Sequence, residues 1–289
     1  MSVTPSASLL QRADLRTLWL LGDPVSHSMS PLIQNQALGT LDEKMVYLAA
    51  RVEAAAFESV VRTLPNLGAV GANVTVPHKQ RAFEMCDVLS ERVGLMRAVN
   101  TFHFREDKIF GDNTDGIGWW RAVTADFPSA TFSKGLVIGS GGAARAVCHT
   151  LVAQGVSELV LLNRTAANAQ KLKDELPNQV KVTVEELACF RAHLSDGTLV
   201  VQTSSVGLKD ETTPVPLPCE WPDRCYLSEL IYGRETSLLR SVRALGGAAQ
   251  DGLGMLCGQA AHSLALWTGR SIEEIPFDEM LRTARRCLS

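Results

Sequence analysis

The feature that most limits what this chain can fold into is the alternation of short apolar runs with stretches of helical period, from end to end. The apolar runs are bounded by Gly, Pro and Asn, which is typical of βα units. We therefore expect an α/β protein with parallel strands. The predicted strands cover residues 17–21, 45–50, 71–76, 136–138, 159–163, 180–184 and 198–202.

Between these runs, apolar residues recur at helical spacing. A β-hairpin is expected at 100–104 and 108–110, turning through Arg105-Glu106-Asp107. The four prolines within 212–222 predict an extended loop rather than a central strand. The predicted helices cover residues 53–64, 79–88, 117–127, 143–154, 166–176, 185–193 and 254–267.

Length and charge limit the possible partners. A chain of 289 residues accommodates about two domains of ~150 residues each, and the polar segment 128–135, with its Pro and Gly, predicts a boundary. The 28 basic and 31 acidic residues give a formal net charge of −3. No chain-wide basic field exists, so we expect no nucleic-acid or membrane partner and only local recognition of anions. A monomer or a homodimer fits this size.

The seven cysteines are scattered, odd in number and without a CxxC pair or zinc-site spacing. We expect reduced, mostly buried thiols, as in a reducing compartment. Residues 1–16 lack the basic-then-apolar pattern of a signal peptide, and no run of ~20 apolar residues occurs. We therefore expect the protein to be cytoplasmic. We also expect it to have no metal site.

A glycine-rich turn follows the apolar strand at 136–138 and opens the next helix. It matches G-x-G-x-x-G/A, the dinucleotide-binding pattern, with alanine in the last place. The glycines allow a tight turn and a close approach of backbone N–H groups to a pyrophosphate at the helix N-terminus. The alternative is a glycine-rich βα turn that binds nothing. The candidate cofactor residues here are Gly139, Ser140, Gly141, Gly142 and Ala143.

The end of the next strand indicates which dinucleotide fits. NAD enzymes place an acidic residue there to bind the ribose hydroxyl, but this strand ends in Asn163-Arg164-Thr165. Arg164 has the planar fork of donors that grips a 2′-phosphate. NADP is therefore favoured over NAD, unless Arg164 is an ordinary solvated arginine.

Three polar segments in the first half are candidates for substrate chemistry. Residues 22–31 follow the first strand, and Ser30-Pro31 is expected to cap a helix. Strand alternation puts Asn73 and Thr75 on one side, just before Lys79 at a helix start, where a lysine opposes the helix dipole. The third segment is 112–116, in which Asp115 could be only a cap. Each segment taken singly is also compatible with a structural role.

Taken together, these runs resemble the shikimate dehydrogenase family. They occur in the family's order from about Leu20 to Gly269, which is nearly the whole chain. The runs are GDPVSHSMSP (22–31), NVTVPHK (73–79), AVNT (98–101), DNTDG (112–116), GSGGAAR (139–145), NRT (163–165) and DGLGMLCGQAAHSLALWTG (251–269).

The resemblance implies NADP-dependent, reversible hydride transfer between shikimate and 3-dehydroshikimate in aromatic amino-acid biosynthesis. It also implies an N-terminal α/β substrate-binding domain (1–116), completed by C-terminal helices (252–289). A Rossmann-type, doubly wound NADP-binding domain (117–251) would follow, with a cleft between the two.

Residue by residue, the resemblance assigns catalysis to Lys79 and Asp115. It assigns substrate binding to Ser28, Ser30, Asn73, Thr75, Asn100, Tyr232 and Gln259. It extends the cofactor set by Asn163, Arg164, Thr165, Leu230 and Gly252. Moving a hydroxyl proton during hydride transfer needs an acid or base, and either member of the Lys79–Asp115 pair could take it first.

The chain departs from the family pattern at several positions, which bear on the cofactor more than on the reaction. Asn168 replaces the second basic residue of the NRT run, so Arg164 is left as the main 2′-phosphate contact. The remaining departures are Gln34, residues 202–207 (QTSSVG), Glu229 and Gly233.

Two alternative functions stay open. One is a quinate or dual quinate/shikimate dehydrogenase that uses NAD, and the other is a non-catalytic NADP-binding regulator.

Overall fold

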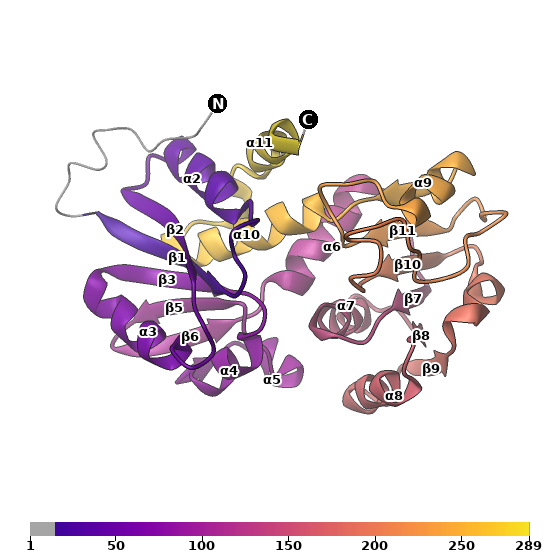
Figure 1. Cartoon of the computed structure of the whole chain (residues 1–289), viewed down its shortest axis with the longest axis horizontal. Coiled ribbons are helices and arrows are strands. Elements are labelled where there is room, and N and C mark those ends of the chain that lie inside the picture. The colour runs from indigo at the N-terminus through magenta and orange to yellow at the C-terminus, as the bar shows by residue number, and fades with distance from the viewer. Residues whose placement is uncertain (1–14, 289) are drawn as a thin grey trace. The chain divides into compact units, whose positions relative to one another are not determined.

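A computed structural model describes residues 15–288 of the chain (Figure 1). Residues 1–14 and 289 lie outside it. The prediction that residues 1–16 form no signal peptide therefore falls mostly outside the described residues. The chain divides into two compact units. One contains the residues up to Thr114 together with those from Leu256 onward, and the other is Asp115–Met255.

The first unit is built on a mixed six-stranded sheet in the order β2-β1-β3-β5-β6-β4. β1 pairs in parallel with β2 and β3, whereas β3–β5 and β5–β6 are antiparallel. The predicted hairpin is confirmed, and Glu106 and Asp107 at its tip both have positive φ, the twist that suits a two-residue hairpin turn. The strands are β1 (Arg16–Gly22), β2 (Met45–Arg51), β3 (Ala69–Val74), β4 (Val88–Leu89), β5 (Thr101–Arg105) and β6 (Lys108–Asp112).

Two helices of the first unit are shorter than predicted. α4 ends at Glu84 rather than near residue 88, because Val88 leaves the helix to pair with Phe110 of β6. The expected helix at 53–64 is a shorter α-helix, α3, continued by a 3₁₀ turn at Leu64–Leu67. The helices are α2 (Ser30–Thr40), α3 (Phe57–Thr63), α4 (Lys79–Glu84), α5 (Val93–Met96), α10 (Leu253–Thr268), which the first unit shares from Leu256, a 3₁₀ turn at Ile272–Glu274 and α11 (Phe277–Leu288).

The C-terminal helix α10 packs directly on the sheet of the first unit. Trp267 donates its indole N–H to the carbonyl of Phe102 at 2.8 Å. A Cβ at Gly71 would lie 2.1 Å from the indole nitrogen, so only glycine leaves room for this ring. On α2, the Gln34 amide donates to the carbonyl of Ala260 at 3.1 Å. Residues far apart in the sequence therefore form one core.

The second unit contains an all-parallel sheet in the order β12-β11-β10-β7-β8-β9. Numbered along the chain within this unit, that order is 3-2-1-4-5-6 read from β9, the order of the dinucleotide-binding Rossmann fold. The strands are β7 (Lys134–Ile138), β8 (Glu158–Leu162), β9 (Lys181–Glu185), β10 (Thr198–Gln202), β11 (Tyr226–Glu229) and β12 (Ala248–Gln250). The helices are α6 (Asp115–Asp126), α7 (Gly142–Ala153), α8 (Ala166–Glu175) and α9 (Ser237–Ala244).

Apolar side chains cover both faces of this second sheet. Val137 and Leu161 belong to one buried cluster, which includes Trp119, whereas the neighbouring Leu136 and Val160 belong to a second one. Successive strand residues point to opposite faces, so the sheet is buried on both sides, as in a doubly wound fold. The predicted fold class is confirmed.

The second unit and the thiols differ from the sequence prediction in some respects. Residues 187–193 form a 3₁₀ helix instead of the α-helix expected at 185–193, and β11 and β12 were not predicted. The proline-rich stretch 212–222 contains no strand, as expected. None of the seven cysteines forms a disulfide, but the expectation that most are buried is wrong, since only Cys148, Cys225 and Cys257 are.

Candidate functional site

The serine loop of the first unit joins β1 to α2. Ser30 is not the helix cap that the sequence suggested: it is already the first helical residue, and its N–H donates to Ser28 Oγ at 3.2 Å. Ser28 Oγ thus accepts the N–H of the first helical residue, although no side chain caps α2. This contact leaves the Ser28 hydroxyl hydrogen able to point outward. Ser30 is buried and Ser28 is half-buried.

The serine loop lies beside the end of β3. Asp23 donates its N–H to the carbonyl of Val76 at 3.0 Å, and Thr75 donates to that of Leu21 at 2.9 Å. A Cβ at Gly22 would lie 2.2 Å from Thr75 Cγ2, so glycine permits this close packing. The parallel pairing of β1 and β3 therefore brings the first two candidate segments to the same sheet edge.

Asn73, on β3, is 4% exposed and forms hydrogen bonds with four other residues. Its Oδ1 accepts from the hydroxyl of Tyr47 at 2.8 Å. Its Nδ2 lies 3.2 Å from the carbonyl oxygen of Asn100, 3.0 Å from Thr101 Oγ1 and 2.9 Å from Ser263 Oγ. We call these four partners and Asn73 itself the Asn73 cluster.

Asn100 ties the third candidate segment to this cluster. Its Oδ1 accepts from the backbone N–H of Thr114 at 2.8 Å and from Thr101 Oγ1 at 2.8 Å. Thr114 Oγ1 also lies 3.1 Å from Ser263 Oγ. The structure therefore brings Asn73, Thr75 and Asn100 to one edge of the first sheet.

Lys79 is the first residue of α4 and is half-buried. Its carbonyl accepts from Val99 N–H at 2.9 Å, and the preceding His78 is held by a 2.6 Å hydrogen bond between its Nε2 and the carbonyl of Val52. His78 also stacks on Phe57, with ring centroids 4.3 Å apart. The backbone that carries the lysine is thus fixed on both sides.

The other predicted substrate residues lie on different elements. Gln259 is half-buried on α10 and donates to the carbonyl of Leu256 at 3.0 Å. Asp115 is buried and begins α6, where the helix N-terminus favours a carboxylate. Tyr232 is half-buried in the loop between β11 and α9. Their roles in substrate binding and catalysis stay predictions.

The glycine turn of the second unit has the shape that the sequence suggested. Gly139 has φ +111°, and a Cβ there would lie 2.5 Å from Thr203 Oγ1, so this position requires glycine. Gly141 and Gly142 have open space where a Cβ would be. No side chain caps the 12-residue helix α7, and no acidic residue occurs in its first turn. Its N-terminal N–H groups are thus suited to an anion.

The end of β8 presents Arg164 to solvent. Asn163 Nδ2 donates to the carbonyl of Thr165 at 2.8 Å, which fixes the turn. Within residues 15–288, the exposed Arg164 guanidinium makes neither an ion pair nor a side-chain hydrogen bond. It is therefore available to an anionic group.

Leu230 and Gly252 meet at the carboxyl ends of the neighbouring strands. A Cβ at Gly252 would lie 2.0 Å from the carbonyl oxygen of Leu230, and Gly252 N–H donates to the carbonyl of Ile231 at 2.9 Å. Leu230 N–H donates to the carbonyl of Gln202 at 3.0 Å. The predicted cofactor residues of this unit thus lie along the carboxyl edge of its sheet, where Rossmann ligands bind.

Two departures from the family pattern are neighbours at this edge. Gln202 and Glu229 are register partners on β10 and β11. The Gln202 side chain holds the following loop through hydrogen bonds to Ser204 and Val206. Glu229 is 1% exposed: its Oε2 accepts from Thr236 Oγ1 at 2.6 Å, and its Oε1 has no hydrogen-bond partner in the described chain. Burial raises the pKa of Glu229 above its ordinary value.

Glu229→Gln should therefore change how stability depends on pH. Because the folded protein holds the Glu229 proton to a higher pH than the unfolded chain, this group stabilises the fold at low pH and loses that contribution as pH rises from about 4.5. The variant has no carboxyl group to titrate at this position, so its free energy of unfolding relative to wild type should rise as the pH increases above about 4.5. Urea unfolding at several pH values measures this, with the exposed Glu91→Gln as control. A constant difference across the range would contradict it.

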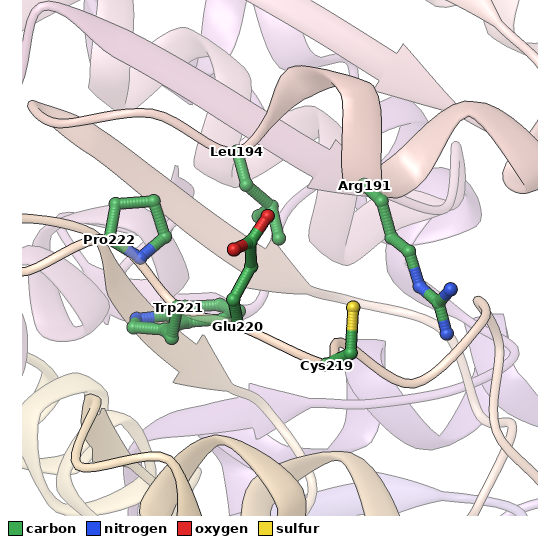
Figure 2. A pocket seen from close by; sticks show the side chains of 6 residues that line it. All are labelled: Arg191, Leu194, Cys219, Glu220, Trp221 and Pro222. Carbon is green, nitrogen blue, oxygen red and sulfur yellow. The ribbon is translucent and has the colours of Figure 1, made fainter.

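A pocket of about 220 Å³ lies elsewhere on the second unit (Figure 2). The guanidinium of Arg191, one of the lining residues, donates to the carbonyl of Leu217. The lining residues precede β10 and β11, at the amino ends of these strands, so the pocket is no part of the candidate dinucleotide site. It is lined by Arg191, Leu194, Cys219, Glu220, Trp221 and Pro222.

Metal-ligating clusters and membrane-spanning helices are both absent from the described part of the chain. Between residues 15 and 288, no group of three or more His, Cys, Asp or Glu side chains could hold a metal ion. None of the helices described there has the length and apolar composition needed to cross a membrane.

Sequence reasoning missed Tyr47, Thr101, Thr114 and Ser263. Ser263 carries a signal that could have been used, because it follows Gln259 by four residues and so lies on the same face of α10. Thr101 lies in the AVNT run and Thr114 in the DNTDG run. Tyr47 lies inside an apolar strand, where nothing distinguishes it from a core aromatic residue.

The strand order, the open glycine turn and the available arginine define the second unit as a dinucleotide-binding Rossmann domain in a two-unit α/β protein. Family models match in the same order along the chain. They are the shikimate dehydrogenase substrate binding domain at residues 20–102, shikimate / quinate 5-dehydrogenase at 122–208 and the shikimate 5'-dehydrogenase C-terminal domain at 252–285.

Individual proteins agree with these matches. The chain is 36% identical to a shikimate dehydrogenase (NADP(+)) of Methanopyrus kandleri, over 95% of this chain and 97% of that protein. It is similar to the structure of shikimate 5-dehydrogenase from Thermus thermophilus in complex with NADP(H) and shikimate, with a TM-score of 0.84 and 31% identity over 94% and 99% of the two chains. A quinate dehydrogenase from Corynebacterium glutamicum in complex with NAD has a TM-score of 0.86 and 25% identity over 94% and 99%. The chain belongs to the shikimate dehydrogenase family.

Proposed function

We propose that this protein is an NADP-dependent shikimate dehydrogenase that interconverts shikimate and 3-dehydroshikimate. The observation that carries the proposal is the Asn73 cluster, whose central residue shares the run 73–79 with Lys79. It occurs in a chain 36% identical to a shikimate dehydrogenase (NADP(+)) over 95% of its length. These polar side chains suit a small ligand with several hydroxyl groups.

The substrate carboxylate is assigned to the serine loop. Ser28 and Ser30 supply hydroxyl donors, and the formal net charge of −3 requires this recognition to be local. Asn73, Thr75, Asn100 and Gln259 are assigned to the ring hydroxyls, and Tyr232 to the carboxylate side. The residues up to 116, completed by 252–289, would form the substrate-binding domain, and residues 117–251 the cofactor domain.

Proton transfer at the substrate oxygen is assigned to Lys79 and Asp115 as a pair. Oxidation of a secondary alcohol removes the hydroxyl proton, and reduction returns it to the developing alkoxide. Lys79 can hold or release a proton at that oxygen, and its backbone is fixed by Val99 and His78. The Asp115 carboxylate would keep the lysine oriented toward the reacting oxygen.

The second unit fits NADP. The open space at Gly141 and Gly142 and the uncapped start of α7 leave room and N–H donors for a pyrophosphate. Gly139, Ser140 and Ala143 would line the same turn, Asn163 to Thr165 would bind the adenosine 2′-phosphate, and Leu230 and Gly252 would lie against the nicotinamide half. When bound, NADPH supplies the hydride for the reduction.

Initial-rate assays in four combinations, shikimate or quinate with NADP or NAD, test the proposal. We expect the highest kcat/KM with shikimate and NADP. Absence of turnover with every pair would refute the enzyme proposal and favour a non-catalytic NADP-binding regulator.

A second candidate is a quinate or dual quinate/shikimate dehydrogenase that uses NAD. Asn168 favours it, because this position offers no positive charge to a 2′-phosphate. The C. glutamicum quinate dehydrogenase in complex with NAD shows that a similar fold binds NAD. The same four assays separate the two candidates, since the second predicts the highest kcat/KM with NAD.

Replacing Arg164 tests how NADP is selected. Arg164→Ala should raise KM for NADP by about 10- to 100-fold, because a charge-assisted bidentate contact is lost. KM for NAD, which lacks the 2′-phosphate, should stay unchanged. Lys171→Ala removes an exposed charge from the neighbouring helix α8 and serves as control. Equal increases for both cofactors would instead mean that Arg164 supports the turn.

The setting we propose is the cytoplasm, with a monomer or a homodimer as the working form. None of the seven cysteines forms a disulfide, which fits a reducing compartment. Shikimate, 3-dehydroshikimate and NADP are the partners assigned.

A further inference from the structure

The direction of each hydrogen bond around Asn73 can be derived from a backbone group. The carbonyl of Asn100 can only accept, and it lies 3.2 Å from one amide atom of Asn73. That atom must be the nitrogen. The other amide atom, 2.8 Å from the Tyr47 hydroxyl, must therefore be the oxygen, and Tyr47 must donate to it.

Both N–H groups of Asn73 are used inside the protein. They face three acceptors, namely the Asn100 carbonyl, Thr101 Oγ1 and Ser263 Oγ, at 3.2, 3.0 and 2.9 Å. The amide nitrogen has two hydrogens, so no donor is left for a ligand. The oxygen has two lone pairs, and Tyr47 takes one. One acceptor site is all that Asn73 can offer a substrate.

Tyr47 contributes to this cluster through that hydrogen bond and through its packing. It is 1% exposed, and its ring packs 6.1 Å from that of Trp267. Burial raises the pKa of Tyr47, so its hydroxyl keeps its proton and remains a donor.

We propose that Tyr47 is a positioning residue that fixes the Asn73 amide with its oxygen toward the substrate, so that this subsite accepts only a hydroxyl donor. The inference rests on the proposed function, in which Asn73 contacts a ring hydroxyl of shikimate. This hydroxyl must be one that is not oxidised, because the reacting position alternates between hydroxyl and carbonyl. A carbonyl or an ether oxygen at that position meets a second acceptor and is rejected. The subsite thus distinguishes the hydroxyl pattern of the ring by hydrogen-bond polarity as well as by shape.

Tyr47→Phe removes one oxygen and keeps the ring. Titration calorimetry of shikimate into the protein without cofactor should show an affinity about 5- to 30-fold weaker than wild type, as expected for a lost buried hydrogen bond that orients its partner. KM for NADP should stay within twofold. The matched control is Tyr226→Phe, whose hydroxyl makes no hydrogen bond within the described residues and whose ring packs on Phe127 and Phe132. It should bind shikimate as wild type does.

Monodeoxy analogues of shikimate separate positioning from a merely structural role. In a double-mutant cycle between Tyr47→Phe and each deoxy ligand, one ring hydroxyl should couple to Tyr47 and the others should not. A structural role would lower thermal stability without such coupling. A folded Tyr47→Phe protein that binds shikimate within twofold of wild type, or a cycle in which no hydroxyl couples, would overturn the proposal. If wild type itself binds no shikimate, the proposed function fails instead.

Neutron diffraction from wild-type crystals exchanged into D₂O tests the polarity without any variant. We expect two deuterons on the Asn73 amide nitrogen, which faces Asn100 and Ser263, and one deuteron on the Tyr47 oxygen. Deuterons on the Asn73 amide directed at Tyr47 would overturn the proposal. Because this experiment uses only the wild-type protein, it tests the proposal even if Tyr47→Phe does not fold.

Discussion

Replacing Lys79 with alanine should lower kcat by about 10²- to 10⁴-fold, the usual contribution of a positioned acid or base. The reason is that Lys79 is the side chain assigned to the proton at the substrate oxygen, and proton transfer stabilises the transition state far more than the bound ground state. KM for shikimate should therefore change little. Steady-state kinetics with shikimate and NADP measure both quantities.

The matched control lies on the same helix. Arg81 is exposed and pairs with Glu58 and Glu84 at 2.8 and 3.0 Å, so Arg81→Ala removes a cation from α4 without touching the assigned site. Its kcat should equal that of wild type. Unaltered turnover in Lys79→Ala would remove the lysine from the mechanism, and equal losses in both variants would attribute the effect to damage to α4.

Asp115→Asn should lower kcat/KM by about 10²- to 10³-fold, because the variant keeps the shape of the side chain and removes the charge that supports proton transfer. Asp115 is buried at the start of α6, where its carboxylate also benefits from the helix dipole. Loss of that benefit alone is worth only about 0.3–1 kcal/mol of stability. Kinetics and thermal unfolding together separate the two effects.

Asp278→Asn provides the comparison. Asp278 is an exposed aspartate in the first turn of α11, so its replacement removes a similar helix-dipole interaction far from the assigned residues in the sequence. It should reduce stability slightly and leave kcat/KM unchanged. If Asp115→Asn behaves in the same way, its role is that of a helix cap alone.

Local patterns were sufficient to predict much of the fold. The strand at 198–202, the hairpin turning at 105–107 and the helix after the glycine turn follow from apolar periodicity and turn residues, which act over a few positions. The requirement for glycine at Gly139 also follows from its motif, and the structure adds Thr203 as the residue that enforces it.

The errors arose where distant residues decide the outcome. α4 stops at Glu84 because β6 offers Val88 a strand partner, which no local pattern reveals. At Ser30 the difference is one of helix boundary, since this residue is the first of α2 rather than its cap. In α4, by contrast, tertiary pairing overrides a local helical preference.

The candidate site was predicted in its motifs but not in its supporting contacts. Asn73, Thr75 and Lys79 share one run, so sequence alone grouped them. Tyr47 and Ser263 are 26 and 190 residues away from Asn73 in the sequence. They reach Asn73 only because β2 pairs within the sheet and α10 packs on it. Such partners carry no motif of their own.

Direct observation of hydride transfer tests the central claim most directly. The protein would be incubated with 3-dehydroshikimate and NADPH in which both C4 hydrogens are deuterium, and the product would be examined by mass spectrometry. We predict shikimate one mass unit heavier than the product formed with ordinary NADPH. The Lys79→Ala variant should form none of this labelled product in the same incubation time. Unlabelled shikimate, or no shikimate at all from the wild-type protein, would contradict the assignment.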